Sequence, residues 1–293
     1  RRTRPPPAAW RVLPFGGFRV LEEGVEVERQ GALLRLGGWG AGFGRSLVLS
    51  LAFVAEAVVG MVVGLFVRRG RRKGAVGDEI FSLGAEAVPV VTVIGALLGL
   101  ILAFQASYQL RTFGASIYVA NLVGLGMVRE MGAMMAAVIM AGRTGAAFAA
   151  QLGTMQANEE VDALVTLGIS PIEFLVLPRM MALVLMMPLL CLYADLMGIL
   201  GGVLVGVGML DLPLQQYLVQ TQNAVALNHF AVGIVKSVVF GVLVALAGCL
   251  RGMQSGRDAT AVGEAATRAV VTGIVAIIVS DAAITVICDI LDV

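Results

Sequence analysis

Long apolar runs alternate with short polar stretches along most of this chain. A transmembrane helix needs about 20 consecutive, mainly apolar residues. Five runs meet that requirement, and they cover 84–110, 119–152, 174–209, 230–250 and 269–291. The pattern therefore predicts an all-α membrane protein with five transmembrane helices.

A sixth apolar run covers 46–67, with Glu56 as its one charged residue. Arg45 precedes this run, and the basic stretch RRGRRK follows it at 68–73. Basic residues at both ends are typical of a helix that lies along the membrane surface, or enters one leaflet and returns. We therefore expect an interfacial or re-entrant elbow helix here, although the length of the run also allows a full span.

Residues 1–45 differ in kind from the rest of the chain. The first ten, RRTRPPPAAW, are basic and proline-rich, which is typical of a disordered segment. Later pieces such as VEVER and ALLRL alternate in the manner of short strands. We expect an N-terminal cytoplasmic extension over 1–45 and a membrane domain over 46–293.

The composition agrees with a membrane protein. Hydrophobic residues make up 58% of the 293-residue chain and charged residues 14%, and the mean hydropathy is +0.91. Soluble domains have about a quarter of their residues charged, so this composition excludes a soluble protein. A net charge of +1 argues against a nucleic-acid partner, which requires a concentrated basic face. The three cysteines lie inside apolar runs without metal-ligand spacing, so we expect no metal site.

The distribution of Lys and Arg predicts the orientation in the membrane, because basic residues collect in cytoplasmic loops. Loops 68–83 and 251–268 are basic, whereas loop 210–228 contains no Lys or Arg. Loop 153–173 is flanked by Arg143 and Arg179. We therefore expect loops 68–83, 153–173 and 251–268 in the cytoplasm, together with the N-terminus, and the C-terminus outside.

Loop 153–173 has a helical pattern of its own. Asn158 is a candidate N-cap, and Gly168 with Pro171 would end the helix. Its acidic and apolar positions fall mostly on opposite sides, with Glu159, Glu160 and Asp162 against Val161, Leu164, Val165 and Leu167. An acidic amphipathic helix between two spans indicates a docking element for a cytoplasmic partner, and a solvated connector is the alternative.

Three charges interrupt the second span, whose stretch 127–155 reads MVREMGAMMAAVIMAGRTGAAFAAQLGTM. Charges inside a membrane are costly and usually serve a function. On a regular helix Arg129 and Arg143 would lie about 40° from eclipsed and ~21 Å apart along the axis. Arg143 falls near the cytoplasmic end, where it can anchor the helix by snorkelling. Arg129 and Glu130 fall in the outer half, where a water-filled or headgroup-lined cavity would have to accept them.

Lys236 in the fourth span is the other intramembrane cation, and Glu130 is its natural counter-charge. A purely structural ion pair is the alternative to a functional one. Small residues recur at every fourth position between the charges of 127–155, and such ladders allow close helix packing. We expect that role for Gly142, Gly145 and Ala149.

Two lysines, Lys73 and Lys236, are the only ones in the chain, and neither follows a glycine. The phosphate-binding loop G-x-x-x-x-G-K-[ST] is therefore absent from the sequence, and if ATP drives this protein a separate subunit must bind it. The single histidine, His229, lies at the outer end of a span, where a structural or interfacial role is expected. No nucleophile motif or catalytic carboxylate pair is visible, so we do not expect an enzyme.

The stretch 128–179 reads VREMGAMMAAVIMAGRTGAAFAAQLGTMQANEEVDALVTLGISPIEFLVLPR and resembles the signature of the MlaE (YrbE) permease family. That signature joins R-E-[LM]-G-P, A-G-R-x-G-[AS]-A and a later P-R. Ala133 stands where the family usually has Pro, and Gln151 stands where it usually has Glu. The segments QNAVALNHFAVGIVKSVVFG and ATRAVV also match, so the resemblance covers about residue 46 to the C-terminus.

The resemblance implies a homodimeric permease of an ABC-type transporter in the bacterial inner membrane, with an elbow helix and five spans. It implies that phospholipid, or a related lipid, moves between that membrane and a periplasmic MCE-domain partner. ATP and Mg would be bound by a separate ATPase subunit, and some members also work with a STAS-domain protein. Residues 1–45 would then be either a STAS-like remnant or a disordered tail.

Roles for individual residues follow by position from the same resemblance. The lipid cavity would carry the charges of Arg129, Glu130 and Lys236, and its wall would include Leu102, Gln105, Gln109 and Phe113. The helix around 155–168 would be the coupling helix, which contacts the ATPase through Glu159, Glu160, Asp162 and Leu164.

Two other classes of protein stay open at this point. A secondary transporter driven by protons or ions would use Glu130, Asp195 and Asp281 as a relay and would need no ATPase. A membrane scaffold would assemble other proteins without transporting anything, and it would tolerate removal of the intramembrane charges.

Overall fold

The computed structural model describes residues 52–61, 80 and 83–291, and all regular elements within this part are helical. Five helical segments there are long and apolar enough to cross a membrane: Leu83–Arg111, Ser116–Ala157, Ile172–Gly208, Leu227–Met253 and Ala259–Ile290. They coincide with the five predicted runs, so the prediction of an all-α membrane protein with five spans is confirmed. The expectations for 1–45 and for most of 46–67 concern residues outside the described part.

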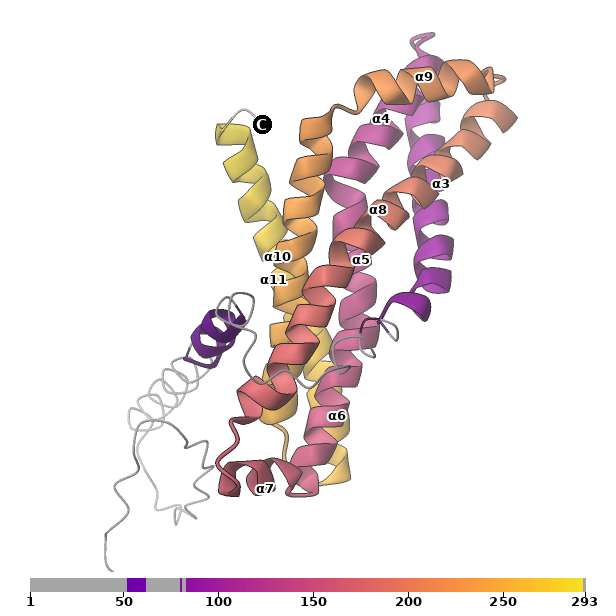
Figure 1. Cartoon of the computed structure of the whole chain (residues 1–293). Coiled ribbons are helices and arrows are strands. Elements are labelled where there is room, and N and C mark those ends of the chain that lie inside the picture. The colour runs from indigo at the N-terminus through magenta and orange to yellow at the C-terminus, as the bar shows by residue number, and fades with distance from the viewer. Residues whose placement is uncertain (1–51, 62–79, 81–82, 292–293) are drawn as a thin grey trace, which may run out of the picture.

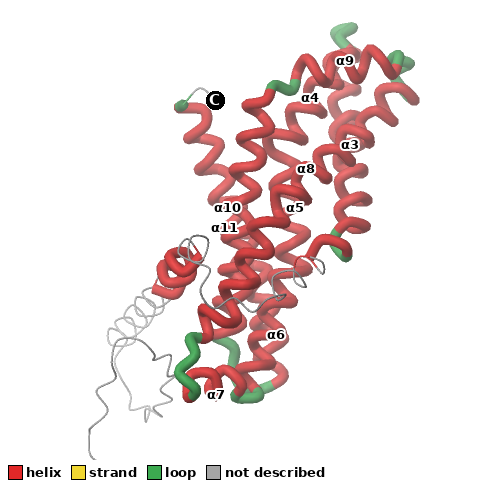
Figure 2. Tube along the Cα trace, viewed as in Figure 1, coloured by secondary structure: helices red, strands yellow, loops and turns green. Residues whose placement is uncertain are grey.

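The five spans lie side by side in one elongated bundle (Figure 1), and the loops that join them lie mainly at its two ends (Figure 2). Four of the spans are dominated by one long helix each: α3 (Val88–Arg111), α8 (Leu177–Gly208, preceded by the π turn η4, Ile172–Val176), α10 (Leu227–Met253) and α11 (Ala259–Ile290). Two short helices lie at opposite ends of the bundle in Figure 1: α7 (Glu160–Thr166) at one end, and α9 (Leu214–Ala224) at the other, near the C-terminus.

The second span is a continuous helical segment of 42 residues, Ser116–Ala157. Its hydrogen-bond pattern changes several times along its length, through η1 (Ser116–Tyr118), α4 (Val119–Gly126), η2 (Met127–Met131), α5 (Gly132–Met140), η3 (Ala141–Gly145) and α6 (Ala146–Ala157). Both η2 and η3 are π turns. The segment 119–152 was expected as one regular helix, so these two turns are a finding of the structure.

The fifth span begins about ten residues before the apolar run that predicted it. The residues ATAVGEAATR at 259–268 are too polar for a membrane run, but Ala, Glu and Arg favour a helix. Arg268 also donates to Glu264 at 2.8 Å, one turn earlier on the helix. Hydropathy therefore predicted the apolar part of α11 correctly, but it did not predict where the helix begins, because the first ten residues are helical without being apolar.

A ten-residue apolar helix, Ala52–Met61, is the described part of the sixth apolar run. Phe53 and Ala57 are buried in the main hydrophobic core of the protein. Gly60 faces Leu177 at the start of α8, where an added Cβ would lie 3.4 Å from the leucine side chain. These ten described residues pack against the bundle.

Glycines bring the first and third spans into backbone contact. A Cβ added at Gly99 of α3 would lie 1.7 Å from the carbonyl oxygen of Gly198 on α8. A Cβ added at Gly201 would lie 2.1 Å from the carbonyl oxygen of Ala96. Side chains any larger than hydrogen would push the two helices apart, so these glycines set the distance between α3 and α8.

The end helix α9 is fixed by a buried tyrosine. Tyr217 is fully buried, and its ring fills the space above Gly202 and Gly206 of α8. A Cβ at Gly206 would lie 2.5 Å from the ring. Burial raises the pKa of Tyr217 to about 12, because the phenolate would lose its hydration. The contact holds α9 across the end of the bundle (Figure 1).

Candidate functional site

The charges of the second span lie on its two π turns. Arg129 and Glu130 belong to η2, and Arg143 belongs to η3. A π turn inserts one extra residue into an α-helix, rotates the side chains that follow and is frequent at functional sites. The angle of about 40° expected between Arg129 and Arg143 assumed 100° per residue throughout. That angle does not apply, because π-turn geometry intervenes at both positions.

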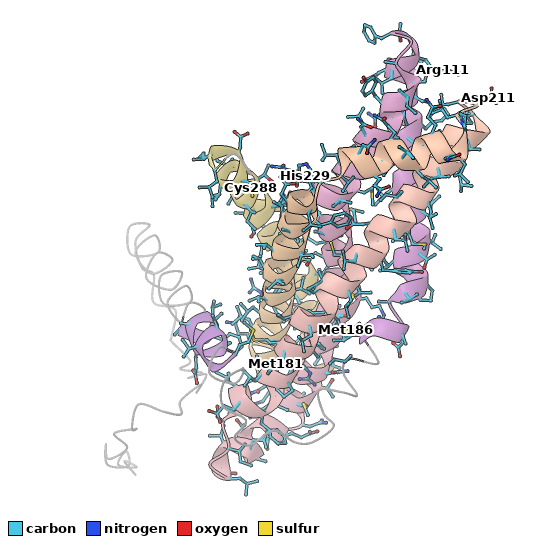
Figure 3. The ribbon with its side chains drawn as sticks, turned by 45° about the horizontal axis from the view of Figure 1, so that its top comes forward. Arg111, Met181, Met186, Asp211, His229 and Cys288 are labelled. Atoms are coloured by element: carbon cyan, nitrogen blue, oxygen red, sulfur yellow. The ribbon has the colours of Figure 1, made fainter. Side chains whose placement is uncertain are left out.

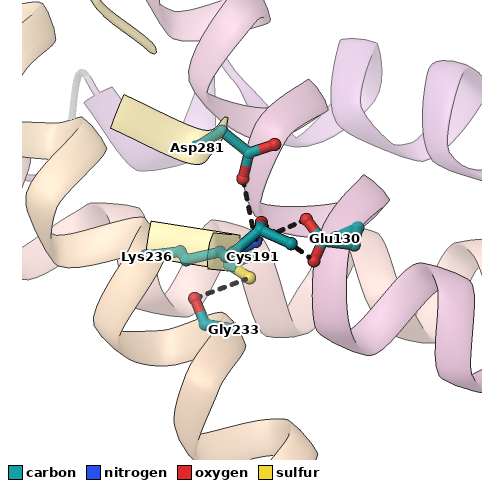
Figure 4. Close-up of polar contacts among 6 residues, drawn as sticks. Glu130, Cys191, Gly233, Lys236 and Asp281 are labelled. Atoms are coloured by element: carbon teal, nitrogen blue, oxygen red, sulfur yellow. Dashed lines mark hydrogen bonds and ion pairs between the residues drawn. The ribbon is translucent and has the colours of Figure 1, made fainter. Parts of the chain in front are cut away.

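Lys236 of α10 is the centre of a cluster of polar contacts between three spans (Figure 4). Its side chain is fully buried, and its Nζ forms an ion pair with Glu130 of η2. From α11, Asp281 Oδ1 lies 2.9 Å from Nζ, and the hydroxyl of Thr285 lies 2.8 Å from it. Thr285 also donates to Glu130 Oε1 at 3.3 Å. We call these four residues the Lys236 cluster.

The structure thus brings Glu130 and Lys236 together, as their charges predicted, and adds two partners from α11. The ammonium group donates hydrogen bonds to Glu130 and Thr285, and Asp281 adds a second negative charge as an ion-pair partner. Lys236 was expected to line a lipid cavity. In the conformation described, its ammonium group is enclosed by protein oxygens, so a headgroup would reach it only after one of them moves.

Arg129 points to a different partner, at the end of the bundle that carries α9. Its Nη1 lies 3.3 Å from Nδ1 of His229, near the start of α10 (Figure 3). Both side chains are half-buried. An arginine is always a donor, so Nδ1 of the imidazole is the acceptor in this contact. His229, which was expected to be structural or interfacial, therefore orients Arg129.

Arg143 lies closer to the α7 end, where it forms an ion pair with Glu86 just before α3. The side chain of Arg143 is 30% exposed and that of Glu86 is 66% exposed. The pair ties the second span to the start of the first. An anchoring arginine was expected here, but its partner was missed, since nothing in the sequence places position 86 beside position 143.

The expected wall residues of the first span do not join the Lys236 cluster within this chain. Leu102 is half-buried and packs against the core formed by α3, α4 and α8, including Val119, Val123 and Val205. Gln105 and Gln109 are exposed on α3, and Phe113 lies beyond its end with 82% of its surface exposed.

The α7 helix presents both acidic and apolar residues at its end of the bundle. Glu159, Glu160 and Asp162 are exposed or half-exposed, and Arg257 bridges Glu159 at 3.3 Å and Asp162 at 2.8 Å. Leu164 is half-buried against the core, and Leu167 is 73% exposed. The surface therefore combines carboxylates, the Arg257 side chain that bridges two of them, and the exposed apolar residue Leu167.

The ends of α7 agree only in part with expectation. The helix stops where predicted, because Gly168 adopts a positive φ of 74° just after it. The predicted N-cap is wrong by one residue. Asn158 caps the end of α6, and Glu159, with a φ of 61°, stands at the N-cap of α7. The amide of Asn158 instead donates to Glu160 at 3.3 Å.

The small residues expected to pack helices behave differently from one another. Gly145 and Ala149 face α10, where a Cβ on Gly248 would lie 2.7 Å from the Gly145 carbonyl, and one on Gly252 would lie 3.0 Å from Ala149. Gly142 is exposed, and an added Cβ there would meet nothing within 4 Å of the described chain.

Both departures from the family signature have a clear place in the structure. Ala133 is fully buried in the main core. Gln151 accepts a hydrogen bond at 3.1 Å from Arg179, whose guanidinium group also lies over the ring of Phe148 at 5.5 Å. The amide of Gln151 is therefore a neutral partner for this arginine.

Five apolar spans with ionisable groups enclosed between them define a multi-pass membrane protein, and buried charges of this kind mark transport pathways. Among the described residues, no group of three or more His, Cys, Asp or Glu side chains could hold a metal ion. The fold and the site together indicate a transmembrane permease.

Comparison with known proteins agrees with that class. Residues 76–287 match the family described as permease MlaE. A probable ABC transporter permease protein of Rickettsia typhi is 38% identical over 207 residues, which cover 71% of this chain and 80% of the relative. A probable ABC transporter permease protein of Synechocystis is 33% identical over 70% of this chain and 78% of its own length. The chain belongs to the MlaE permease family.

A plant protein is also similar. Protein TRIGALACTOSYLDIACYLGLYCEROL 1, chloroplastic, of Arabidopsis thaliana is 28% identical over 204 residues, which cover 70% of this chain and 58% of the plant protein.

Proposed function

We propose that this chain is the membrane subunit of an ABC-type transporter that moves phospholipid, or another lipid with an anionic headgroup. A second copy of the chain would complete the permease. Energy would come from a separate ATPase subunit that binds ATP and Mg, and an MCE-domain protein would exchange lipid on the periplasmic side. A STAS-domain protein is a further candidate partner.

The observation that carries this proposal is the Lys236 cluster. It supplies both a cation for a phosphate and two carboxylates that already compensate that cation. A headgroup phosphate is a strong acceptor for an ammonium group, so it can replace Glu130 or Asp281 as the partner of Lys236. Competition with the carboxylates would keep the lipid from binding too tightly for release.

Arg129 is the natural first contact for such a headgroup. It is half-buried rather than enclosed, and it lies on the same π turn as Glu130. An arginine presents a planar fork of donors that matches phosphate geometry. In this scheme the phosphate meets Arg129 first and reaches Lys236 when α11 moves.

The span α11 is suited to move. In its most apolar stretch only 11% of the residues are buried, compared with 56% for the segments that contain α8 and α10. Its C-terminal turns diverge from α10 in Figures 1 and 3. Asp281 and Thr285 attach the same part of α11 to the bundle, so loss of these contacts would free it.

The ATPase would dock at the α7 end, which we assign to the cytoplasm because the basic loop 251–268 lies at the same end, where Arg257 bridges Glu159 and Asp162. The exposed Leu167 and the carboxylates of α7 are suited to a groove with an apolar floor and a basic rim. The C-terminus would then lie in the periplasm and the chain in the bacterial inner membrane. The helix Ala52–Met61 would belong to an elbow in the cytoplasmic leaflet.

The name of the Arabidopsis relative contains that of a glycolipid, trigalactosyldiacylglycerol. This supports a lipid as the substrate class, although the name concerns the plant protein alone.

Transfer of labelled phospholipid tests the proposal. The chain would be co-expressed with its ATPase, purified as a complex and reconstituted in vesicles, and ATP-dependent transfer would be compared with Glu130→Ala and Lys236→Ala. Both variants should assemble and lose most transfer. The control is Glu264→Ala, which removes a similar but exposed ion pair with Arg268 and should transfer at the wild-type rate.

Two outcomes would overturn the proposal. Wild-type transfer in both cluster variants would show that the cluster does not handle lipid. Transfer that continues without any ATPase would favour a secondary transporter. Mass spectrometry of lipids extracted from the purified complex would name the substrate.

A further inference from the structure

The third intramembrane carboxylate, Asp195, lies apart from the other two. It occupies the middle of α8 with 3% of its surface exposed. The proton-relay alternative grouped it with Glu130 and Asp281. Those two carboxylates both pair with Lys236, whereas Asp195 forms no ion pair in the described part of the chain.

The contacts of Asp195 are few and weak. The thiol of Cys191, one turn earlier on α8, lies 3.8 Å from Oδ2. The other oxygen, Oδ1, is buried and has no hydrogen-bond partner among the described residues. The same thiol lies 4.0 Å from the carbonyl oxygen of Gly233 on α10. A thiol is a weak donor, so it stabilises a negative charge poorly.

Gly132, which follows the π turn η2, makes room for this carboxyl group. A Cβ added at Gly132 would lie 1.7 Å from Asp195 Oδ1, so any other residue would exclude the side chain. The glycine of the R-E-M-G stretch, Gly132, therefore leaves space for a buried acid on the opposite helix.

The charged groups of the neighbouring elements are already engaged. Glu130 of η2 and Lys236 of α10 bind each other, and Arg129 of η2 binds His229 of α10. The helices α4 and α5 contain no ionisable residue, and Glu86 and Arg111 lie at the two ends of the first span. Among the described residues of these elements, no cation is thus left to balance an ionised Asp195.

An unpaired carboxylate inside a membrane protein costs several kcal/mol, so such a group binds a cation or a proton. Metal cations require several oxygen ligands, and the described residues around Asp195 offer one carboxylate and one thiol. A proton needs only one carboxylate oxygen, so the surroundings of Asp195 fit a proton. We propose that Asp195 is a proton-binding site, whose carboxyl group is protonated while α8 is packed on Gly132 and ionises when water reaches that contact.

The inference extends beyond lipid transport and does not depend on it. It divides the three intramembrane carboxylates into a pair that balances Lys236 and a single neutral acid. Any motion that separates α5 from α8 would release one proton per chain. The position of this proton follows from packing alone, so it can be tested on the permease without its partners.

Infrared spectroscopy of the full-length permease in detergent gives the direct test. We expect the carbonyl band of a protonated carboxylic acid at neutral pH, sensitive to exchange into D₂O. The band should disappear in Asp195→Asn, which has nearly the same shape, and persist in the matched variants Glu130→Gln and Asp281→Asn. A wild-type spectrum without the band would overturn the proposal, as would a band that disappears in Glu130→Gln instead.

Thermal unfolding supplies a second readout that does not need the infrared band. If the folded chain holds one proton that the unfolded chain releases, the midpoint of the wild type should fall relative to that of Asp195→Asn as the pH rises from about 5 to about 7, because an unfolded aspartate is already ionised over that range. Parallel midpoints over this range would contradict a protonated Asp195. Sodium or potassium titrations at fixed pH should leave both midpoints unchanged. A rise in the wild-type midpoint alone with one of these cations would contradict the proposal and identify that cation as the ligand of Asp195.

Discussion

The α3–α8 contact and the α10–α11 contact both join neighbouring spans, but they do so by different means. Along α3 and α8, glycines bring backbone against backbone with no charged group between them. Between α10 and α11, Lys236, Asp281 and Thr285 form polar contacts beside a helix whose surface is mostly unburied. Close backbone packing has no alternative arrangement of similar energy, whereas an ion cluster can exchange one partner for a ligand. The comparison suggests that the α3–α8 side of the bundle is rigid and that the α10–α11 side moves.

Removal of the central cation should produce the largest effect. Lys236→Met leaves the half-buried carboxylates of Glu130 and Asp281 without a counter-charge, and removing the buried partner of an ion pair in this way costs about 4 kcal/mol. We expect the thermal midpoint to fall steeply and α11 to become sensitive to protease. Arg268→Met, which removes an exposed cation from the same helix, provides the comparison and should cost less than about 0.5 kcal/mol.

The glycine contact should be the next most sensitive. Gly99→Ala places a methyl group 1.7 Å from a carbonyl oxygen of α8, and overpacking of this kind costs about 3 kcal/mol. The midpoint of thermal unfolding should drop, with no recovery from lipid addition. Gly142→Ala, whose methyl group would meet nothing within 4 Å among the described residues, is the matched control and should unfold like the wild type. Equal behaviour of the two variants would show that α3 and α8 are not held by their glycines.

A smaller effect is expected from Thr285→Val, which keeps the shape and both ion pairs but removes the hydroxyl that Lys236 and Glu130 share. Loss of a hydrogen bond to a charged group costs about 2 kcal/mol. Calorimetry should show a modest drop in stability, and protease sensitivity should rise only in α11. Sensitivity that rises in α3 as well would mean that the two contacts are coupled.

The smallest effect should come from removing Arg257, which bridges two carboxylates at the start of α7. Arg257→Ala removes two exposed ion pairs, with Glu159 and Asp162, and such pairs contribute about 0.5 kcal/mol. The bundle should keep its stability. If α7 contacts the ATPase, the variant should lower ATP-driven transfer while its midpoint of thermal unfolding stays close to that of the wild type. An unchanged transfer rate would argue against a role for Arg257.

The sequence allowed the spans to be predicted because each is a long apolar run, and hydropathy is a local property. The Glu130–Lys236 pair was predictable as well, since buried charges of opposite sign seek one another. Asp281 and Thr285 were missed as partners because the rotation of α11 relative to α10 depends on packing across the bundle. The π turns carry no clear local signal either, and they changed the expected relation between Arg129 and Arg143.

Glycines illustrate the same limit. The ladder in the second span was visible as small residues at every fourth position, yet Gly142 contacts no other described element, whereas Gly145 contacts α10. The closer contact, between Gly99 and Gly198, joins two spans about a hundred residues apart in the sequence. Spacing shows which residues are small enough for close contact, and only the fold shows which of them meet.

Distances across the two contacts during ATP turnover test the central claim most directly. Spin labels would be placed on the exposed positions Val93 and Leu196 for α3–α8, and Val235 and Val286 for α10–α11, with the half-buried Cys288 changed to serine. Pulsed electron paramagnetic resonance would compare the nucleotide-free and ATP-trapped transporter. The account predicts that the α10–α11 distance changes while the α3–α8 distance stays the same. A fixed α10–α11 distance, or an equal change across α3–α8, would contradict it.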